Sequence, residues 1–484
     1  MKLNELLKGL TYEIIQGSDN IEINNIGWDS RKVLSNSLFI CVRNRNVDRH
    51  SYASAAIQNG AVALVIEHDI EEVPAKVTII KVEDSKKAMA SIANIYFGEP
   101  SKKFNLIGIT GTNGKTSVTY FVYKVLENAG RLTGIIGTIE NKVGDKELKT
   151  EKLNPTTPDS IELQASFKEI SEAGGSDVVM EVTSSALDKG RVYECDFNIG
   201  AFTNLTQDHL EEHGTMENYK NAKLKLFKKC KKTLTNIDDP VSKEIIETAS
   251  GEVFTYGIER AADFKAFDIV YGLNFIEFSL SFKSQIKNVK FNVPGKFSVY
   301  NALATIGICY LSGLELEEII EGLKNITGVP GRIEKIANDK EILTIVDYAH
   351  SPDSLENIIK SMKDIARGKV ITVFGCGGNR DTSKRPIMGD IAGKLSDFVV
   401  ITSDNPRNEN PAAIIDEIEQ GILKTNCDYI KSENREEAIY TALGKANSGD
   451  VVIIAGKGHE TYQILGDNII HFDDREVARK YFSR

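Results

Sequence analysis

Alternation between apolar and polar positions predicts strands and helices in three successive blocks. The first block ends near residue 102, and its short apolar runs, separated by turn residues, predict strands. These predicted strands lie at 21–26, 38–42, 63–66 and 77–81. A helix is predicted at about 85–97, and the polar segment 98–103 predicts a linker.

The second block opens on an apolar run at 104–109 that predicts a buried strand. Apolar side chains then recur at the i, i+3, i+4, i+7 spacing of an amphipathic helix. They are Val118, Phe121, Val122, Val125 and Leu126. Further on, the pattern predicts a strand at 177–182, a β-rich stretch at 264–293 and a helical stretch at 299–323.

Strands and helices alternate in the third block, which begins after the turn residues GVPGR at 328–332. Strands are predicted at 369–374, 398–402 and 451–455, and helices at about 385–395, 411–424 and 435–446. This alternation indicates a parallel sheet covered by helices, with ligands bound beyond the carboxyl ends of its strands. We therefore predict an α/β protein with domains at 1–102, 103–331 and 332–484.

Composition supports a soluble globular protein with full cores. At about 150 residues per domain, 484 residues suit about three domains, and 41% hydrophobic with 26% charged residues is ordinary for packed cores. A net charge of −10 argues against a nucleic-acid partner. We expect neither a signal peptide nor a membrane segment, and the six scattered cysteines favour a reducing, cytoplasmic setting.

The string GITGTNGKTS at 108–117 predicts a phosphate-binding loop between the strand and the helix. Gly111 and Gly114 allow backbone N–H groups to converge on phosphate oxygens, Lys115 supplies a charge, and the Thr116 hydroxyl suits Mg²⁺. Five residues separate Gly108 from Gly114, whereas the usual P-loop has four. The loop predicts ATP or a similar nucleotide.

Two further segments suit a magnesium site. Glu181 directly follows an apolar strand, and Asp208–His209 lies in a polar segment further along. Mg²⁺ takes oxygen ligands and an occasional imidazole. Taken alone, Glu181 is best explained as a carboxylate that caps a helix. Taken alone, His209 is best explained as a structural histidine. Most of the lysines between 223 and 232 are best explained as a solvated helix face, with Lys223 as the exception.

From residue 108 onward the chain resembles the Mur ligase family, the ATP-dependent enzymes that build the peptide stem of bacterial cell-wall precursors. The resemblance extends over the whole length, and its motifs follow in family order. They are GTNGKTS at 111–117, MEVTSSALDKGRV at 180–192, FTNLTQDHLEEHGTMENYKNAK at 202–223, PGKFSVYNALA at 294–304, GVPGRIE at 328–334, DYAHSPDSL at 347–355, GCGGNRDTSKRPIMG at 375–389 and AGKGHETYQ at 455–463.

The resemblance implies a central ATPase-type domain with a mostly parallel sheet, a C-terminal Rossmann-like domain and a smaller N-terminal α/β domain. It implies catalytic roles for Lys115, Glu181, His209 and Lys223. It places ATP on Gly111, Thr112, Asn113, Gly114, Lys115, Thr116, Ser117, Asn301, Arg332 and Asp347. It places Mg²⁺ near Thr116, Glu181, His209 and Lys223, the last as a carbamylated lysine (N6-carboxylysine).

For the substrates, the resemblance implies two further sets of residues. The nucleotide-linked dipeptide would contact Ser30, Thr156, Thr157, Thr183, Lys189 and Arg191. Diaminopimelate would contact Arg380, Asp404, Asn405, Pro406, Arg407, Gly456 and Glu460. In the family the DNPR motif marks enzymes that add meso-diaminopimelate, whose distal carboxylate suits the Arg407 guanidinium, while Asp404 and Asn405 suit its distal ammonium. The family's Gly-rich loop is replaced by VRNRNVDRH at 42–50, which leaves the uridine contacts there open.

The implied reaction is ATP-dependent ligation of meso-2,6-diaminopimelate to the D-glutamyl γ-carboxylate of UDP-N-acetylmuramoyl-L-alanyl-D-glutamate, through an acyl phosphate, in peptidoglycan precursor synthesis. ATP and Mg²⁺ are the expected cofactors, and we expect a monomer. Three alternatives stay open: another diamino acid such as lanthionine or L-lysine, a folate-polyglutamylating ligase, and a non-catalytic nucleotide-binding regulator. The segments WDSR at 28–31 and DNPR at 404–407 argue against the folate enzyme. The intact set Lys115, Glu181, His209 and Lys223 argues against the regulator.

Overall fold

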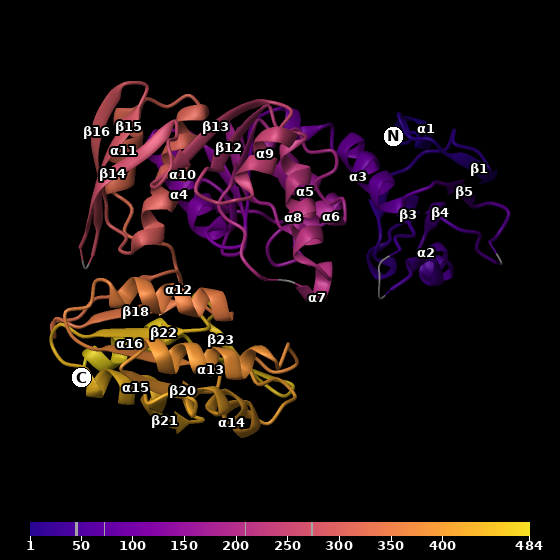
Figure 1. Cartoon of the computed structure of the whole chain (residues 1–484). Coiled ribbons are helices and arrows are strands. Elements are labelled where there is room, and N and C mark those ends of the chain that lie inside the picture. The colour runs from indigo at the N-terminus through magenta and orange to yellow at the C-terminus, as the bar shows by residue number, and fades with distance from the viewer. Residues whose placement is uncertain (44–46, 72, 209, 273) are drawn as a thin grey trace.

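The chain folds into three α/β units, each built around its own main sheet (Figure 1). The computed structural model describes residues 1–43, 47–71, 73–208, 210–272 and 274–484. The predicted α/β class and three-part architecture are confirmed, while the boundaries at 102 and 331 remain predictions. Among the described residues, no helix combines the length and apolarity needed to cross a membrane.

The N-terminal unit is a five-stranded sheet in the order β1-β5-β4-β3-β2. Its strands are β1 (Glu13–Gln16), β2 (Asn25–Gly27), β3 (Ser37–Ile40), β4 (Ala61–Ile66) and β5 (Thr78–Lys81). Its helices are α1 (Leu3–Leu6), the 3-10 turns η1 (Ser30–Lys32) and η2 (Arg49–Tyr52), α2 (Ala53–Gln58) and α3 (Ser85–Tyr96). The strand predicted at 21–26 begins later, because the amide of Ile23 donates to Met1 O at 2.8 Å instead of joining the sheet.

The central unit carries an eleven-stranded sheet in the order β16-β15-β14-β13-β12-β11-β6-β10-β7-β8-β9. The strands are β6 (Asn105–Thr110), β7 (Thr133–Ile136), β8 (Asn141–Val143), β9 (Lys146–Glu147), β10 (Asp177–Glu181), β11 (Ile199–Phe202), β12 (Lys232–Asn236), β13 (Glu252–Gly257), β14 (Phe264–Tyr271), β15 (Ile276–Phe282) and β16 (Gln285–Phe291). The helices are η3 (Pro100–Lys102), α4 (Lys115–Asn128), α5 (Ser160–Glu172), α6 (Ser184–Asp188), α7 (Leu210–His213), α8 (Met216–Phe227), α9 (Ser242–Thr248), α10 (Lys296–Leu311) and α11 (Leu316–Lys324).

Strands β6, β10 and β11 lie side by side and parallel at the middle of this sheet. Both faces are buried: Ile107 and Ile109 of β6 pack into one core cluster and Leu106 into the other. Two-sided burial explains why these strands appear in the sequence as continuous apolar runs. Their carboxyl ends therefore meet at one edge, where the polar residues of the predicted site follow.

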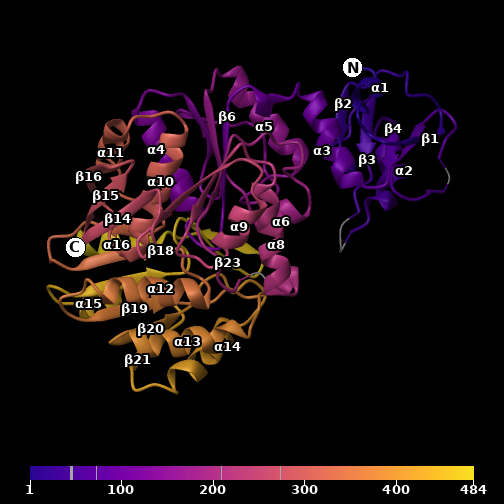
Figure 2. The ribbon, with the colours of Figure 1, turned by 45° about the horizontal axis from the view of Figure 1, so that its top comes forward.

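The C-terminal unit is a six-stranded sheet in the order β17-β18-β22-β19-β20-β21, parallel except for β17. Its strands are β17 (Glu334–Ile336), β18 (Leu343–Asp347), β19 (Val370–Phe374), β20 (Phe398–Thr402), β21 (Asp428–Ser432) and β22 (Val451–Ala455), with a separate hairpin of β23 (Tyr462–Leu465) and β24 (Asn468–His471). Its helices are α12 (Pro352–Lys363), α13 (Lys384–Leu395), α14 (Pro411–Ile422), α15 (Arg435–Lys445) and α16 (Asp474–Phe482). Helix α12 faces the central unit (Figures 1 and 2).

A buried ion pair ties the loops of this third unit together. The guanidinium of Arg435 donates to both carboxylate oxygens of Asp474 at 2.7 Å, and neither side chain is exposed. The same guanidinium donates to Ser403 O and Ala455 O, at the carboxyl ends of β20 and β22. A buried pair with its remaining hydrogen bonds satisfied favours one arrangement over others. It fixes the two strand ends that carry the predicted diaminopimelate residues.

Candidate active site

The predicted phosphate loop connects β6 to α4, and its glycines occupy positions that no larger residue could take. Gly111 has φ +152°, and a Cβ there would lie 1.9 Å from the Thr203 hydroxyl oxygen. Gly114 has φ +84° and caps α4, and its Cβ would lie 2.9 Å from the Asn301 side-chain oxygen. The loop thus passes tightly between neighbouring side chains and ends at a helix N-terminus, which favours anions.

Two lysine amines converge on this loop from different helices. Lys115 of α4 donates to Gly111 O at 2.9 Å and Thr112 O at 2.7 Å, and Lys223 of α8 donates to Gly111 O at 2.8 Å. Only 2% of Lys223 is exposed. Burial lowers the pKa of Lys223 well below its usual range, and repulsion by Lys115 lowers it further. Burial likewise lowers the pKa of Lys115. Two amines therefore lie close together beside the loop, and the carboxylates of Glu181 and Asp208 partly offset their effect on the pKa of Lys115.

The carboxylate of Glu181, at the carboxyl end of β10, lies beside the loop. It accepts from the Thr116 hydroxyl at 2.8 Å and from the amide of Thr138 at 2.7 Å, and only 1% of Glu181 is exposed. A carboxylate and a hydroxyl held together offer the oxygen donors that Mg²⁺ prefers. The predicted ligand His209 lies outside the described residues.

Next to Glu181 lies a cluster of hydroxyl groups from the predicted substrate segments. Thr157 donates to Glu181 O at 2.9 Å and to the Thr183 hydroxyl at 3.2 Å, and Arg191 donates to Thr157 O at 3.1 Å. Thr156 lies 3.0 Å from the Thr138 hydroxyl. The structure therefore brings four of the predicted substrate residues together.

Two other predicted substrate residues lie apart from this cluster. Lys189 points outward, with 41% of its side chain exposed, and donates to Glu212 at 2.6 Å. Ser30 lies in η1 of the N-terminal unit, where its carbonyl accepts from Asn59 at 2.9 Å. Contact between Ser30 and the nucleotide-linked substrate remains a prediction.

The third unit reaches the phosphate loop through two side chains. Asp353 of α12 accepts from the Asn113 amide at 2.6 Å and from the Thr206 hydroxyl at 3.0 Å. Arg332 packs its guanidinium 4.5 Å from the centre of the Tyr348 ring and lies near enough to Lys115 to repel it. The third unit is thus docked on the central unit, and it adds the guanidinium of Arg332 to the basic groups near the loop.

Asp347, the last residue of β18, holds the segment that directly follows Arg332. Its two carboxylate oxygens accept from the amides of Ile333 and Ala349, each at 2.8 Å. Burial raises the pKa of Asp347, and the nearby Arg332 opposes that rise.

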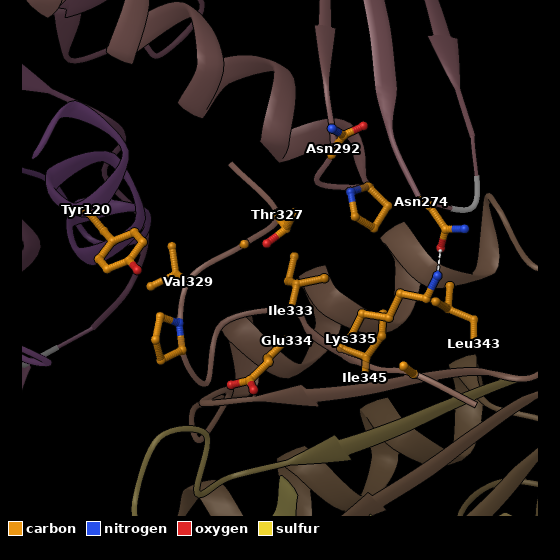
Figure 3. Close-up of a pocket in the computed structure, with 14 residues that line it drawn as sticks. Tyr120, Asn274, Asn292, Thr327, Val329, Ile333, Glu334, Lys335, Leu343 and Ile345 are labelled. Carbon is orange, nitrogen blue, oxygen red and sulfur yellow. Dashed lines mark hydrogen bonds between the residues drawn. The ribbon is translucent and has the colours of Figure 1, made fainter. Parts of the chain in front are cut away.

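A cavity of about 570 Å³ opens beside this junction (Figure 3). Tyr120 of α4 stands on one side and Ile333 of the third unit on the other, with Val329 of the connecting segment between them. Lys335 of β17 donates to the Asn274 side chain at 2.6 Å and links the third unit to the antiparallel edge of the central sheet. The residues shortly before Arg332 in the chain, 327–330, line this cavity.

In the third unit, the predicted diaminopimelate residues gather at the carboxyl ends of the parallel strands. Arg407 has φ +52° and donates to Gly378 O at 2.8 Å. A Cβ on Gly377 would lie 3.0 Å from the Arg407 guanidinium and 3.8 Å from the Arg380 side chain, so both arginines flank this glycine. A Cβ on Gly456 would lie 2.7 Å from a carboxylate oxygen of Asp404.

Asn405 and Glu460 join in a network centred on Lys457, whose side chain is fully buried. Lys457 donates to Glu460 at 3.0 Å and to the side-chain oxygen of Asn405 at 3.2 Å. That oxygen also accepts from the Ile464 amide at 3.0 Å, while the Asn405 NH₂ donates to Glu460 at 2.9 Å. Both partners of the oxygen are obligatory donors, which fixes the orientation of the Asn405 amide.

Three family models match the chain in order: a "Mur ligase family, catalytic domain" over residues 22–97, a "Mur ligase middle domain" over 109–309 and a "Mur ligase, glutamate ligase domain" over 331–458. The chain belongs to the Mur ligase family. The predicted resemblance is therefore confirmed.

Individual Mur ligases match over nearly the whole chain. A UDP-N-acetylmuramoyl-L-alanyl-D-glutamate–2,6-diaminopimelate ligase of Clostridium acetobutylicum is 47% identical, covering 99% of each chain. The enzyme of that name from Caldanaerobacter subterraneus is also 47% identical, covering 99% of this chain and 98% of its own. A solved structure of a ligase of that name is 30% identical with a TM-score of 0.73, covering 100% of this chain and 99% of its own.

Two residues of this Mur ligase site were missed by reasoning from the sequence. Lys457 stands beside Gly456 in a strand-end loop, and this position could have identified it. Asp353 lies in the first turn of α12, where an acidic residue is ordinary and gives no sign of its contact with the phosphate loop.

Replacement of Gly111 by alanine should weaken ATP binding by about tenfold or more, because steric overlap with Thr203 and a strained backbone displace the loop. Gly130→Ala is the matched control, since Gly130 also has positive φ (+79°) but no atom within 4 Å of its Cβ position. Calorimetric titration with ATP measures both. Equal ATP affinity in Gly111→Ala and the wild type would contradict the assignment of the loop.

Proposed function

We propose that this chain is the ATP-dependent ligase that joins meso-2,6-diaminopimelate to the D-glutamyl γ-carboxylate of UDP-N-acetylmuramoyl-L-alanyl-D-glutamate. The main support for the proposal is the sequence identity of 47%, over 99% of both chains, with a UDP-N-acetylmuramoyl-L-alanyl-D-glutamate–2,6-diaminopimelate ligase. The phosphate loop, the hydroxyl cluster beside Glu181 and the two arginines that flank Gly377 support it. We further propose that it acts in the cytoplasm as a monomer.

The reaction proceeds in two steps. The substrate γ-carboxylate attacks the γ-phosphorus of ATP, the bond from that phosphorus to the bridging oxygen breaks, and ADP leaves an acyl phosphate behind. The diaminopimelate amine then attacks the acyl carbon, loses a proton and expels inorganic phosphate. Both partners of the first step are anions, so positioning and charge neutralisation by Lys115 and Arg332 supply most of the catalysis. No side-chain nucleophile is required.

Oxygen donors beside the loop fit Mg²⁺. Thr116 and Glu181 would hold it, with His209 as the further predicted ligand. Bound there, Mg²⁺ neutralises phosphate charge and holds phosphate oxygens for transfer. The Thr116 hydroxyl now donates to Glu181 at 2.8 Å, which keeps both oxygens at the mouth of the loop.

Carbamylation of Lys223 follows from its surroundings. Carbon dioxide reacts with the neutral amine, and burial together with the neighbouring Lys115 favours the neutral form of Lys223. As the bond from the amine nitrogen to carbon forms, the amine loses a proton to solvent, and the resulting carbamate places an anion directly beside Lys115. It thereby relieves the repulsion between two amines that share Gly111 O and adds oxygen donors for metal.

The hydrogen bonds of Asn405 refine how diaminopimelate is recognised. The sequence assigns Asn405 to the distal ammonium, which would need its side-chain oxygen. That oxygen is occupied by Lys457 and Ile464, and what remains available is an N–H donor. We therefore assign Asn405 to the distal carboxylate together with Arg407, and Glu460 with Asp404 to the distal ammonium.

The decisive assay measures ADP release with each substrate omitted in turn, and with diaminopimelate, lanthionine and L-lysine compared side by side. The proposal predicts ADP only when the nucleotide-linked dipeptide and the amino acid are both present, with diaminopimelate preferred to lysine. Preference for lysine would contradict the role of Arg407. Ligation of glutamate to a folate would favour the folate-polyglutamylating alternative, and no turnover with any substrate pair would favour the non-catalytic regulator.

The variant Asn405→Asp should raise the KM for diaminopimelate by about tenfold or more, because it sets a carboxylate against the distal carboxylate of the substrate. The KM for ATP should change little. Asn408→Asp, at an exposed position three residues further on, is the matched control. If Asn405→Asp keeps or improves diaminopimelate binding, Asn405 faces the ammonium instead.

Lys223→Ala should lower kcat by about 100-fold or more, because it removes the carbamate that would offset the charge of Lys115 and offer oxygen donors to a metal. Formate or acetate should restore part of the activity by supplying a carboxylate in the vacated space. Lys225→Ala, on the same helix with 47% of its side chain exposed, should retain full activity with or without the added anion. A Lys223→Ala enzyme that short carboxylates leave unchanged would count against the carbamate.

A further inference from the structure

The guanidinium carbon of Arg49 lies 4.0 Å from the ring centre of Trp28, the single tryptophan of the chain. Trp28 packs on the core of the N-terminal unit, so it supports the guanidinium from one side. A cation held over an aromatic ring in this way is attracted by the face of the ring and keeps its N–H groups for other partners.

The backbone on both sides of Arg49 is fixed by hydrogen bonds. Asp48 accepts from the backbone amide of His50 at 3.0 Å and from its ring Nδ1 at 2.5 Å, and the Ser51 hydroxyl donates to Asp48 O at 2.7 Å. The amide of Arg49 itself donates to Val42 O at 3.2 Å. The side chain is thus carried by an ordered turn and needs little rearrangement to bind a ligand.

The same hydrogen bonds argue against a metal site here, although ligand atoms of Asp48, His50 and His68 lie within 4.8 Å of one another. The backbone amide of Glu67 donates to His50 Nε2 at 2.9 Å. The proton of a neutral His50 therefore sits on Nδ1 and is donated to Asp48, which leaves no lone pair there for a metal. The cluster serves to hold the turn.

Arg49 retains unused hydrogen-bonding capacity. Its Nε is buried and has no hydrogen-bond partner within the part of the chain that the structure describes. Partial burial lowers the pKa of the guanidinium, against the attraction of Asp29 and Asp159. Each of these carboxylates is already paired, Asp29 with Arg31 at 2.7 Å and Asp159 with Arg191 at 2.8 Å. Arg49 is only half-buried and its side chain makes no hydrogen bond to a described residue, so its outer N–H groups can take an acceptor from outside the chain.

The position of Arg49 indicates which chemical group of a ligand would accept its hydrogen bonds. Asp29 precedes Ser30, and Asp159 follows the Thr156–Thr157 pair, so Arg49 lies between two segments predicted to hold the nucleotide-linked substrate. We infer that Arg49 binds the diphosphate of that substrate, donating to phosphate oxygens while it remains over Trp28. The flat fork of a guanidinium matches phosphate oxygens in pairs. This inference rests on the proposed function, because it takes the UDP-linked substrate as given.

Binding of UDP and of uridine to the full chain tests the inference, with calorimetry giving affinities and Trp28 emission locating the ligand. In Arg49→Gln, UDP affinity should fall by about tenfold or more, because a charge-assisted contact with phosphate is lost, while uridine affinity stays within about twofold. Arg43→Gln, an exposed arginine close by in the same loop, should leave both affinities unchanged. Unchanged ATP affinity in Arg49→Gln shows that the rest of the chain is intact.

Two results overturn the inference. UDP affinity in Arg49→Gln equal to that of the wild type shows that Arg49 does not contact phosphate. Equal losses for UDP and uridine show that it recognises the base or merely supports the fold. A wild-type chain that shows no UDP binding by calorimetry would instead contradict the proposed function itself.

Discussion

Two buried amines share one backbone carbonyl at the centre of this protein. Lys115 and Lys223 both donate to Gly111 O, at 2.9 and 2.8 Å, and burial lowers the pKa of each. Such an arrangement is stable only if one amine is neutral or an anion lies between the two. We regard the balance of charge around these two amines, to which the carboxylates of Glu181 and Asp208 contribute, as the constraint around which the phosphate loop and the third domain are arranged.

The architecture concentrates the required groups without placing them near one another in sequence. Three adjacent parallel strands, β6, β10 and β11, end at one edge, so the segments after them must meet there. The loop after β6 supplies the amides and Lys115, β10 ends on Glu181, and α8 returns Lys223 across 112 residues to the same carbonyl. The third domain adds Arg332 from the opposite side.

The same principle operates in the third domain on a different ligand. Strands β19, β20 and β22 are neighbours and parallel, and their carboxyl ends carry the two arginines, the Asp404–Asn405 pair and the loop of Lys457. Buried Lys457 determines which atom of Asn405 can face a substrate. In the proposed diaminopimelate site, recognition of the amino acid would thus depend on a cation that need not touch it.

Much of this could be predicted from the sequence, because buried parallel strands leave continuous apolar runs and strand-end loops carry the polar residues that follow. The strands at 398–402 and 451–455 were predicted to the residue. Strand β21 was missed because it lies at an edge, where partial exposure weakens the apolar pattern. Some of the lysines after 223 were wrongly placed on a helix face, since α8 ends at Phe227. The contact of Asp353 with Asn113 depends on domain docking, which no local pattern encodes.

We propose that Lys223 supplies a further negative charge beside the phosphate loop by reacting with carbon dioxide. Carbon-13 NMR of the protein equilibrated with ¹³C-bicarbonate tests this directly. We expect a single protein-bound carbamate resonance that is absent from Lys223→Ala and retained in Lys225→Ala. The absence of any such resonance from the wild type, or its persistence in Lys223→Ala, would contradict it.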